Sequence, residues 1–130
     1  MKPNPDYLKR LLTAFQDAPA PTTDIREIEA AGVPYNDPQF EFHMRLLNDH
    51  GYVERDDGRP GIGLSGSFDG KMWSVIPLRL TASGHEFAEA LSNNKVFAAV
   101  KANLIGASIG TIKDFAVAFL RGEMSKHGIV

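Results

Sequence analysis

The stretch FHMRLLNDHGYVERDDG, residues 42–58, joins a helix pattern to a strand and a turn. Side chains at the i, i+3, i+4, i+7 spacing form one helix face. This apolar stripe begins just before the quoted stretch and includes one histidine: Phe40, His43, Met44 and Leu47. Gly51 ends the predicted helix at 38–50, because glycine adopts the left-handed C-terminal conformation without a steric penalty. Residues 52–55 then predict a strand, and the acidic turn after it begins a β-hairpin.

Similar signals predict helices on both sides of this stretch. Asn4-Pro5 and Asp37-Pro38 each combine a capping side chain with a proline suited to the first turn of a helix. Residues 24–31 favour a short helix, and a brief strand is the alternative. The richest strand pattern is 72–80. Pro77 lacks an amide hydrogen, so it is expected either where that strand leaves its partner or at an edge. Further helices are predicted at 82–91, 95–105 and 109–126.

The order of these elements predicts an α+β fold, mainly α: a winged helix-turn-helix with a β-hairpin wing at 53–75. Residues 1–80 would form the winged-helix core, and residues 81–130 a C-terminal helical extension. The chain of 130 residues is 43% hydrophobic and 23% charged, as expected for one globular domain. It has no cysteine, which excludes disulfides and thiolate metal sites.

Charge is distributed unevenly along the chain. Residues 18–94 hold six basic and twelve acidic side chains, whereas residues 95–130 hold five basic and two acidic ones. The predicted helix at 38–50 and the strand and turn after it, up to residue 61, are themselves net acidic. Binding to duplex DNA draws on Lys and Arg side chains that displace counterions from phosphate. The acidic middle therefore favours a protein partner over DNA.

Three stretches also carry a resemblance to a known family: FHMRLLNDHGYVE (42–54), LRLTASGHEFAEAL (78–91) and KVFAAVKANL (95–104). Together they resemble a family of short hypothetical proteins from bacterial and phage genomes, the domain of unknown function twenty-five thirteen. Ala82 departs from the pattern, where a large residue is expected. The resemblance implies a winged-helix fold and a phage or prophage setting, without an assigned activity. The matching positions are His43, Leu46, Leu47, Gly51, Leu80, Thr81, Gly84, His85, Glu86 and Phe87.

Two functions without catalysis follow from these patterns. The favoured one is a winged-helix protein of phage or prophage type that binds a host protein of the regulatory or defence machinery. Its acidic winged region would make the contact, through Glu54, Asp56, Asp57 and Asp69. The alternative is a sequence-specific DNA-binding transcriptional regulator that uses helix 38–50 and the wing. Its contacts would come from Arg45, Asn48, Arg55, Arg59 and Lys71.

Histidines raise two chemical hypotheses that the spacing disfavours. His85 and Glu86 suggest a hydrolase, but adjacent helix positions point about 100° apart, and no nucleophile accompanies them. His43 and His50 lie two helical turns apart, about 10 Å, too far for one metal ion. We therefore expect no enzyme activity, no cofactor and no metal. Structural roles are predicted for His43, Gly51, Thr81, Gly84, His85 and Phe87.

The last predicted helix, 109–126, carries an apolar stripe with two interpretations. The stripe completes the core, or it pairs with a second copy in a homodimer or with a different protein, and both uses can coexist. No segment approaches the roughly 20 apolar residues of a membrane-spanning helix. We therefore expect a cytoplasmic location and no membrane partner. The stripe consists of Ile109, Ile112, Phe115, Phe119 and Leu120.

Overall fold

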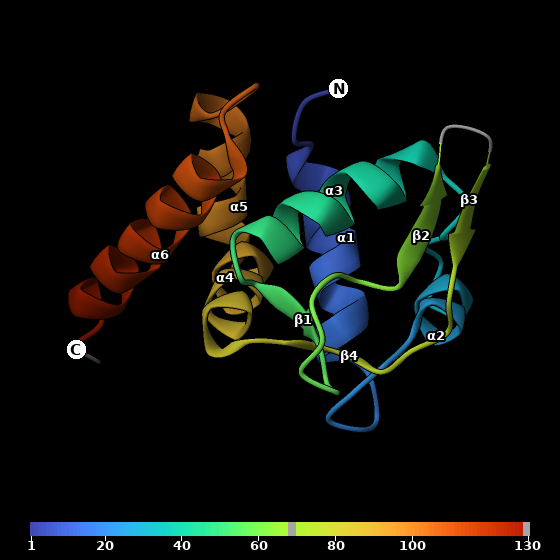
Figure 1. The fold of residues 1–130 in the computed structure, drawn as a ribbon. Coiled ribbons are helices and arrows are strands. Elements are labelled where there is room, and N and C mark those ends of the chain that lie inside the picture. Colours follow the sequence, from blue (N-terminus) through green and yellow to red (C-terminus); the bar gives the residue numbers. More distant parts are fainter. Residues whose placement is uncertain (68–69, 129–130) are drawn as a thin grey trace.

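The computed structural model describes residues 1–67 and 70–128, and it has a mainly helical α+β fold (Figure 1). The predicted coarse class is confirmed, and residues 24–31 contain a short helix. The helices are α1 (Pro5–Gln16), α2 (Ile25–Ala30), α3 (Pro38–Asp49), α4 (Ala82–Ser92), α5 (Asn94–Asn103) and α6 (Ile109–Lys126). The strands are β1 (Val53–Arg55), β2 (Leu64–Ser67), β3 (Gly70–Trp73) and β4 (Leu78–Leu80).

Side-chain caps begin the helices where the sequence predicts them. Asn4 accepts a hydrogen bond from the backbone N–H of Tyr7 at 3.2 Å. Asp37 accepts one from Gln39 at 2.9 Å. Each cap satisfies a backbone donor that has no partner inside the helix. Gly51, with φ of 70°, lies just after α3 in the predicted left-handed conformation.

The strands form two small antiparallel pairs. β1 pairs with β4, with Glu54 opposite Arg79, and β2 pairs with β3, with Gly66 opposite Lys71. An isolated bridge adds Thr23 to the other edge of β4, opposite Leu78. Between β3 and β4 the chain leaves one pairing and enters the next.

The single strand predicted at 72–80 is therefore wrong. Trp73 ends the pairing with β2, and Leu78 begins the pairing with β1. Pro77 lies between the two strands and cannot donate to a neighbour, although its carbonyl accepts from the N–H of Asp56 at 3.0 Å. The alternating apolar pattern runs across both strands, so periodicity alone did not reveal the change of partner.

One hydrophobic core joins residues 1–80 to the C-terminal helices. α4 packs against α1 and also against α5 and α6 (Figure 1). Within the described residues, no helix combines the length and the apolar character needed to cross a membrane. The largest fully buried side chains include Leu8, Leu11, Leu12, Phe40, Met44, Phe87 and Leu91.

Candidate functional site

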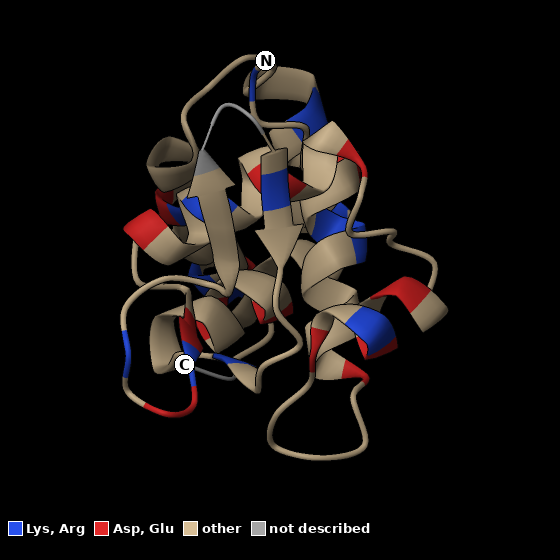
Figure 2. Ribbon diagram, turned by 45° about the vertical axis from the view of Figure 1, so that its right-hand side comes forward, with Lys and Arg blue, Asp and Glu red and all other residues tan. Residues whose placement is uncertain are grey.

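Two of the predicted DNA contacts lie where α3 meets the hairpin, Arg45 on α3 and Lys71 on β3, and both are ion-paired. The Glu41 carboxylate lies 2.8 Å from Nζ of Lys71 and 3.2 Å from Nε of Arg45. The hydrogen bond from Lys71 lowers the pKa of Glu41 below its usual value, with help from Arg45. Phe40 and Trp73 pack edge to face at 5.1 Å and hold β3 against α3. Figure 2 shows the resulting mixture of basic and acidic residues.

Of the remaining predicted DNA contacts, Asn48 and Arg55 are engaged through their side chains, whereas, among the described residues, Arg59 is held only through its backbone N–H. Asn48 donates its side-chain amide to the carbonyl of Val53 at 2.9 Å, which ties α3 to β1. Arg55 forms two bonds with the Asp57 carboxylate, at 3.0 and 2.6 Å. Asp57 also accepts the backbone N–H of Arg59 at 3.0 Å. The bond from Arg55 is the main reason why the pKa of Asp57 is lowered.

A groove of about 500 Å³ runs along α3 next to these pairs. Half-buried Phe42 and Leu46 lie in it, one helical turn apart. Its charged lining is balanced, with two carboxylates and two cations: Glu41, Asp49, Arg45 and Lys71. A neutral, partly apolar surface of this kind does not attract phosphate.

The acidic turn is less acidic than its sequence indicates. Glu54 forms an ion pair with Arg79 across the β1–β4 pairing, and Asp57 is held by Arg55. Asp56 is exposed, and its carboxylate has no ion pair or hydrogen bond within the part of the chain that the structure describes. Asp69 lies outside the described residues. Among the described carboxylates of this set, Asp56 is thus the one without an ion pair.

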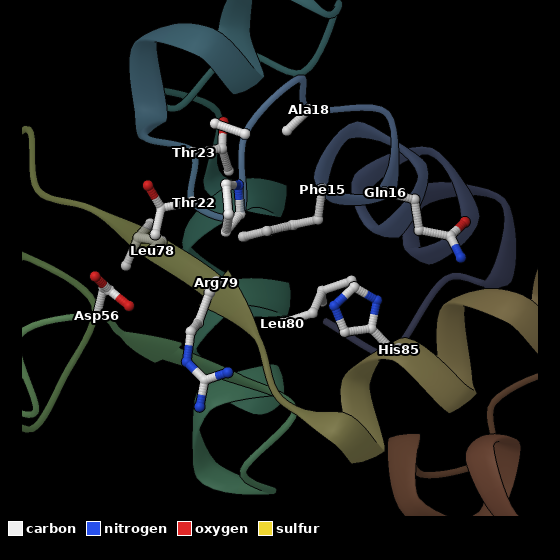
Figure 3. A pocket seen from close by; sticks show the side chains of 12 residues that line it. Phe15, Gln16, Ala18, Thr22, Thr23, Asp56, Leu78, Arg79, Leu80 and His85 are labelled. Atoms are coloured by element: carbon white, nitrogen blue, oxygen red, sulfur yellow. The ribbon is translucent and has the colours of Figure 1, made fainter.

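A cavity of about 370 Å³ lies beside Asp56 (Figure 3). Its apolar lining comes from Phe15 of α1 and from Leu78 and Leu80 of β4. Arg79 and His85 add polar groups at its margin. The loop between α1 and α2, which includes Pro21, Thr22 and Thr23, forms the remaining wall.

His85 does not have the packed position that we predicted. It is exposed and lines this cavity, because Phe87, Ala88 and Leu91 form the buried face of α4. Glu86 is also exposed, and its carboxylate lies 3.9 Å from Nζ of Lys113. Glu86 therefore pairs with α6 and lies apart from the lining of the cavity, so the two side chains form no acid–base pair.

His43 is fully buried with both ring nitrogens engaged. Nε2 accepts the backbone N–H of Asn4 at 3.0 Å, which leaves Nδ1 to donate to the carbonyl of Gln39 at 2.8 Å. This pattern fixes the neutral ring with its proton on Nδ1. Burial lowers the pKa of His43 below 6.5. The Tyr7 ring lies against it, with centroids 4.6 Å apart.

Thr81, Gly84 and Phe87 join α4 to the end of α3 and to β1. Thr81 caps α4 by accepting the N–H of Gly84 at 3.1 Å, and it donates its hydroxyl to the carbonyl of Gly51. A Cβ atom on Gly84 would lie 2.0 Å from the carbonyl oxygen of Tyr52. Phe87 is fully buried and packs edge to face against the Tyr52 ring at 5.4 Å.

The apolar stripe of α6 mainly completes the core. Ile109, Ile112 and Ala116 are at most 1% exposed, and Phe115, Phe119 and Leu120 pack partly buried against the same core. The exposed positions of α6 carry small and polar side chains, including Asp114, Ala118, Arg121 and Ser125. This arrangement favours the core interpretation of the stripe over the homodimer.

Sequence reasoning missed the contribution of Thr23, Leu80 and Arg79 to the cavity. Thr23 is 5% exposed and forms a β-bridge, yet its segment is too short to give a periodic strand pattern. The available signal was the β-branched pair Thr22-Thr23 between Pro21 and the helix cap at Asp24. Arg79 gave no signal, because its role depends on which strand β4 joins.

No protein-family model, curated protein or solved structure matches the chain. The resemblance described from the sequence stays a prediction. Among the described residues, no group of three or more His, Cys, Asp or Glu side chains is arranged to hold a metal ion.

Proposed function

We propose that this chain is a winged-helix-type module that binds a protein partner through the acidic turn after β1 and acts without catalysis. The order α1, Thr23 bridge, α2, α3, β1, hairpin, β4 is that expected for a winged helix, with β2 and β3 as the wing. The resemblance adds a phage or prophage setting to the proposal, and a partner from the host's regulatory or defence machinery.

One observation carries the choice of a protein over DNA. Arg45 and Lys71, which would face phosphate in a DNA complex, share the Glu41 carboxylate. Arg55 is likewise paired with Asp57. A phosphate group approaching these cations meets a carboxylate beside each of them, so the favourable release of counterions is reduced. Asp56, in contrast, is exposed and unpaired within the described residues, and it suits a basic group on a partner.

DNA binding is tested with the wild type and with Glu41→Gln. We expect the wild type to pass through a duplex-DNA column at about 50 mM salt without retention. Glu41→Gln removes one negative charge and releases Arg45 and Lys71, so it should be retained more strongly. Strong, salt-sensitive retention of the wild type that Arg45→Ala abolishes would support the DNA-binding regulator instead.

Partner binding is tested by affinity capture from host lysate, followed by direct binding to the purified candidate. Asp56→Lys should lose the partner. Asp49→Lys is the matched control, because Asp49 is also an exposed carboxylate but lies on α3 in the neutral groove. A protein captured equally by the wild type and by both variants would show that the acidic turn is not the contact.

A further inference from the structure

The two edges of β4 are paired to different extents. On the β1 side, Thr81 donates to the carbonyl of Tyr52 at 3.0 Å, and Asp56 donates to that of Pro77 at 3.0 Å. Backbone groups of an antiparallel strand point alternately to its two edges. Since residues 77 and 81 of this segment face β1, Leu78 and Leu80 direct their N–H and C=O groups to the opposite edge.

On that opposite edge the pairing stops after one position. Leu78 and Thr23 exchange two backbone hydrogen bonds of 2.8 Å each. The same antiparallel register would place Pro21 opposite Leu80. Proline has no N–H and cannot donate to the Leu80 carbonyl. The antiparallel contact between β4 and the α1–α2 loop therefore ends at Thr23.

Leu80 is left with an unusual combination of burial and unpaired backbone groups. The residue is 3% exposed. No hydrogen bond across this edge joins the backbone of Leu80 to another residue in the described ranges. Buried backbone donors and acceptors are nearly always paired, since an unpaired group costs the free energy of its lost hydration.

The cavity beside Asp56 lies along this unpaired part of β4. Its volume is about 370 Å³, and Phe15, Leu78 and Leu80 supply an apolar lining (Figure 3). Asp56, from the segment after β1, supplies a carboxylate at the margin. The site thus offers a strand edge, an apolar lining and a negative charge together.

We propose that an extended peptide segment of the protein partner adds to β4 at Leu80, with an apolar side chain in this cavity and a basic side chain toward Asp56. Strand addition of this kind uses the main chain for affinity and alternate side chains for specificity. The inference rests on the proposed function, because it specifies how the acidic turn contacts its partner. Charge favours a basic segment, since Glu54 and Asp57 are already paired and Asp56 is not.

The probe is the pentapeptide acetyl-Val-Lys-Val-Lys-Val-amide, titrated to millimolar concentration into ¹⁵N-labelled full-length protein. We expect the backbone amide of Leu80 to shift and its hydrogen exchange to slow as the peptide binds. The same peptide with an N-methyl group on its central valine cannot donate the main-chain hydrogen bond of that residue, the one intended to pair with Leu80. It should bind about tenfold more weakly, the effect of one lost hydrogen bond.

Protein variants separate strand addition from attraction by charge alone. Asp56→Lys should weaken the pentapeptide about tenfold, whereas the control Asp49→Lys should leave its affinity unchanged. Equal binding of the N-methylated peptide, or an unaffected Leu80 amide at millimolar peptide, would overturn strand addition. Those outcomes would not contradict the proposed function, which the capture experiment tests separately. The proposed function is refuted if Asp56→Lys still captures the partner.

Discussion

The contact between α4 and the segment after α3 gives the sharpest prediction, because the same substitution at two helical glycines should have opposite effects. At Gly84 an added Cβ would lie 2.0 Å from the Tyr52 carbonyl oxygen and 3.2 Å from Cδ2 of Leu80. The nearest obstacle is backbone, so the helix itself must move. That movement would stretch the bond from Thr81 N–H to the same carbonyl, now 3.0 Å long.

The magnitude follows from three contributions. Forced overpacking costs about 1–3 kcal/mol, and loss of one backbone hydrogen bond costs about 1 kcal/mol more. Replacing glycine by alanine inside a helix returns about 1 kcal/mol. Gly84→Ala should therefore lower the free energy of unfolding by about 1–3 kcal/mol, out of the roughly 5–15 kcal/mol typical of a domain.

Gly122→Ala is the matched control. Gly122 lies in α6, is exposed, and has no atom within 4 Å of an added Cβ among the described residues. The substitution should raise the free energy of unfolding by up to about 1 kcal/mol through helix propensity alone. Urea unfolding followed by circular dichroism at 222 nm measures both variants. If Gly84→Ala proves as stable as Gly122→Ala, the close approach of α4 to Tyr52 described here is incorrect.

Three further predictions concern polar side chains. Thr81→Ala should destabilise the protein by about 1–2 kcal/mol in urea unfolding, because it removes the cap of α4 and the bond to Gly51. Thr81→Ser keeps the hydroxyl and should therefore retain most of the wild-type stability. Burial lowers the pKa of His43 below 6.5, so the unfolded chain takes up a proton at a higher pH than the folded chain does. The free energy of unfolding should therefore be fully maintained above pH 6.5 and should decrease as the pH falls below it. A free energy of unfolding that stays constant from pH 7 to 5 would contradict the neutral buried ring. Burial is the main reason why the pKa of Tyr7 is raised to about 12, and the negative charge of Asp37 adds to the effect. The Tyr7 hydroxyl has no hydrogen-bond partner among the described residues. Tyr7→Phe should therefore leave stability unchanged or raise it by up to about 1 kcal/mol, and should remove one late-ionising tyrosine from the ultraviolet titration.

Local chemistry made much of the helical framework predictable. Asn4, Asp37 and Thr81 each cap a helix where a capping side chain precedes an apolar stripe, and Gly51 follows α3 as its conformational freedom requires. These features depend on residues within one or two turns of each other. The local sequence pattern was therefore enough to predict where these helices begin and where α3 ends.

The parts that escaped prediction depend on contacts between distant segments. His43 was expected in the core, but nothing near it indicated that Asn4, 39 residues away, would satisfy its ring. The strand at 72–80 was predicted as one element because alternation cannot show that Trp73 and Leu78 belong to different pairings. His85 was predicted to be packed because of the residues next to it in the sequence, but its position on the helix faces the cavity.

Charge counting located the acidic surplus of residues 38–61 but not its distribution in the folded chain. It treated every carboxylate of the turn as equal. In the folded chain Glu54 and Asp57 are paired with arginines from their own neighbourhood, so their charges are largely cancelled at the distance of a partner. Asp56 has no such partner among the described residues, and it lines the cavity next to the unpaired edge of β4. Recognition at this surface should therefore depend on one carboxylate and one strand position, and less on the overall acidity of the region.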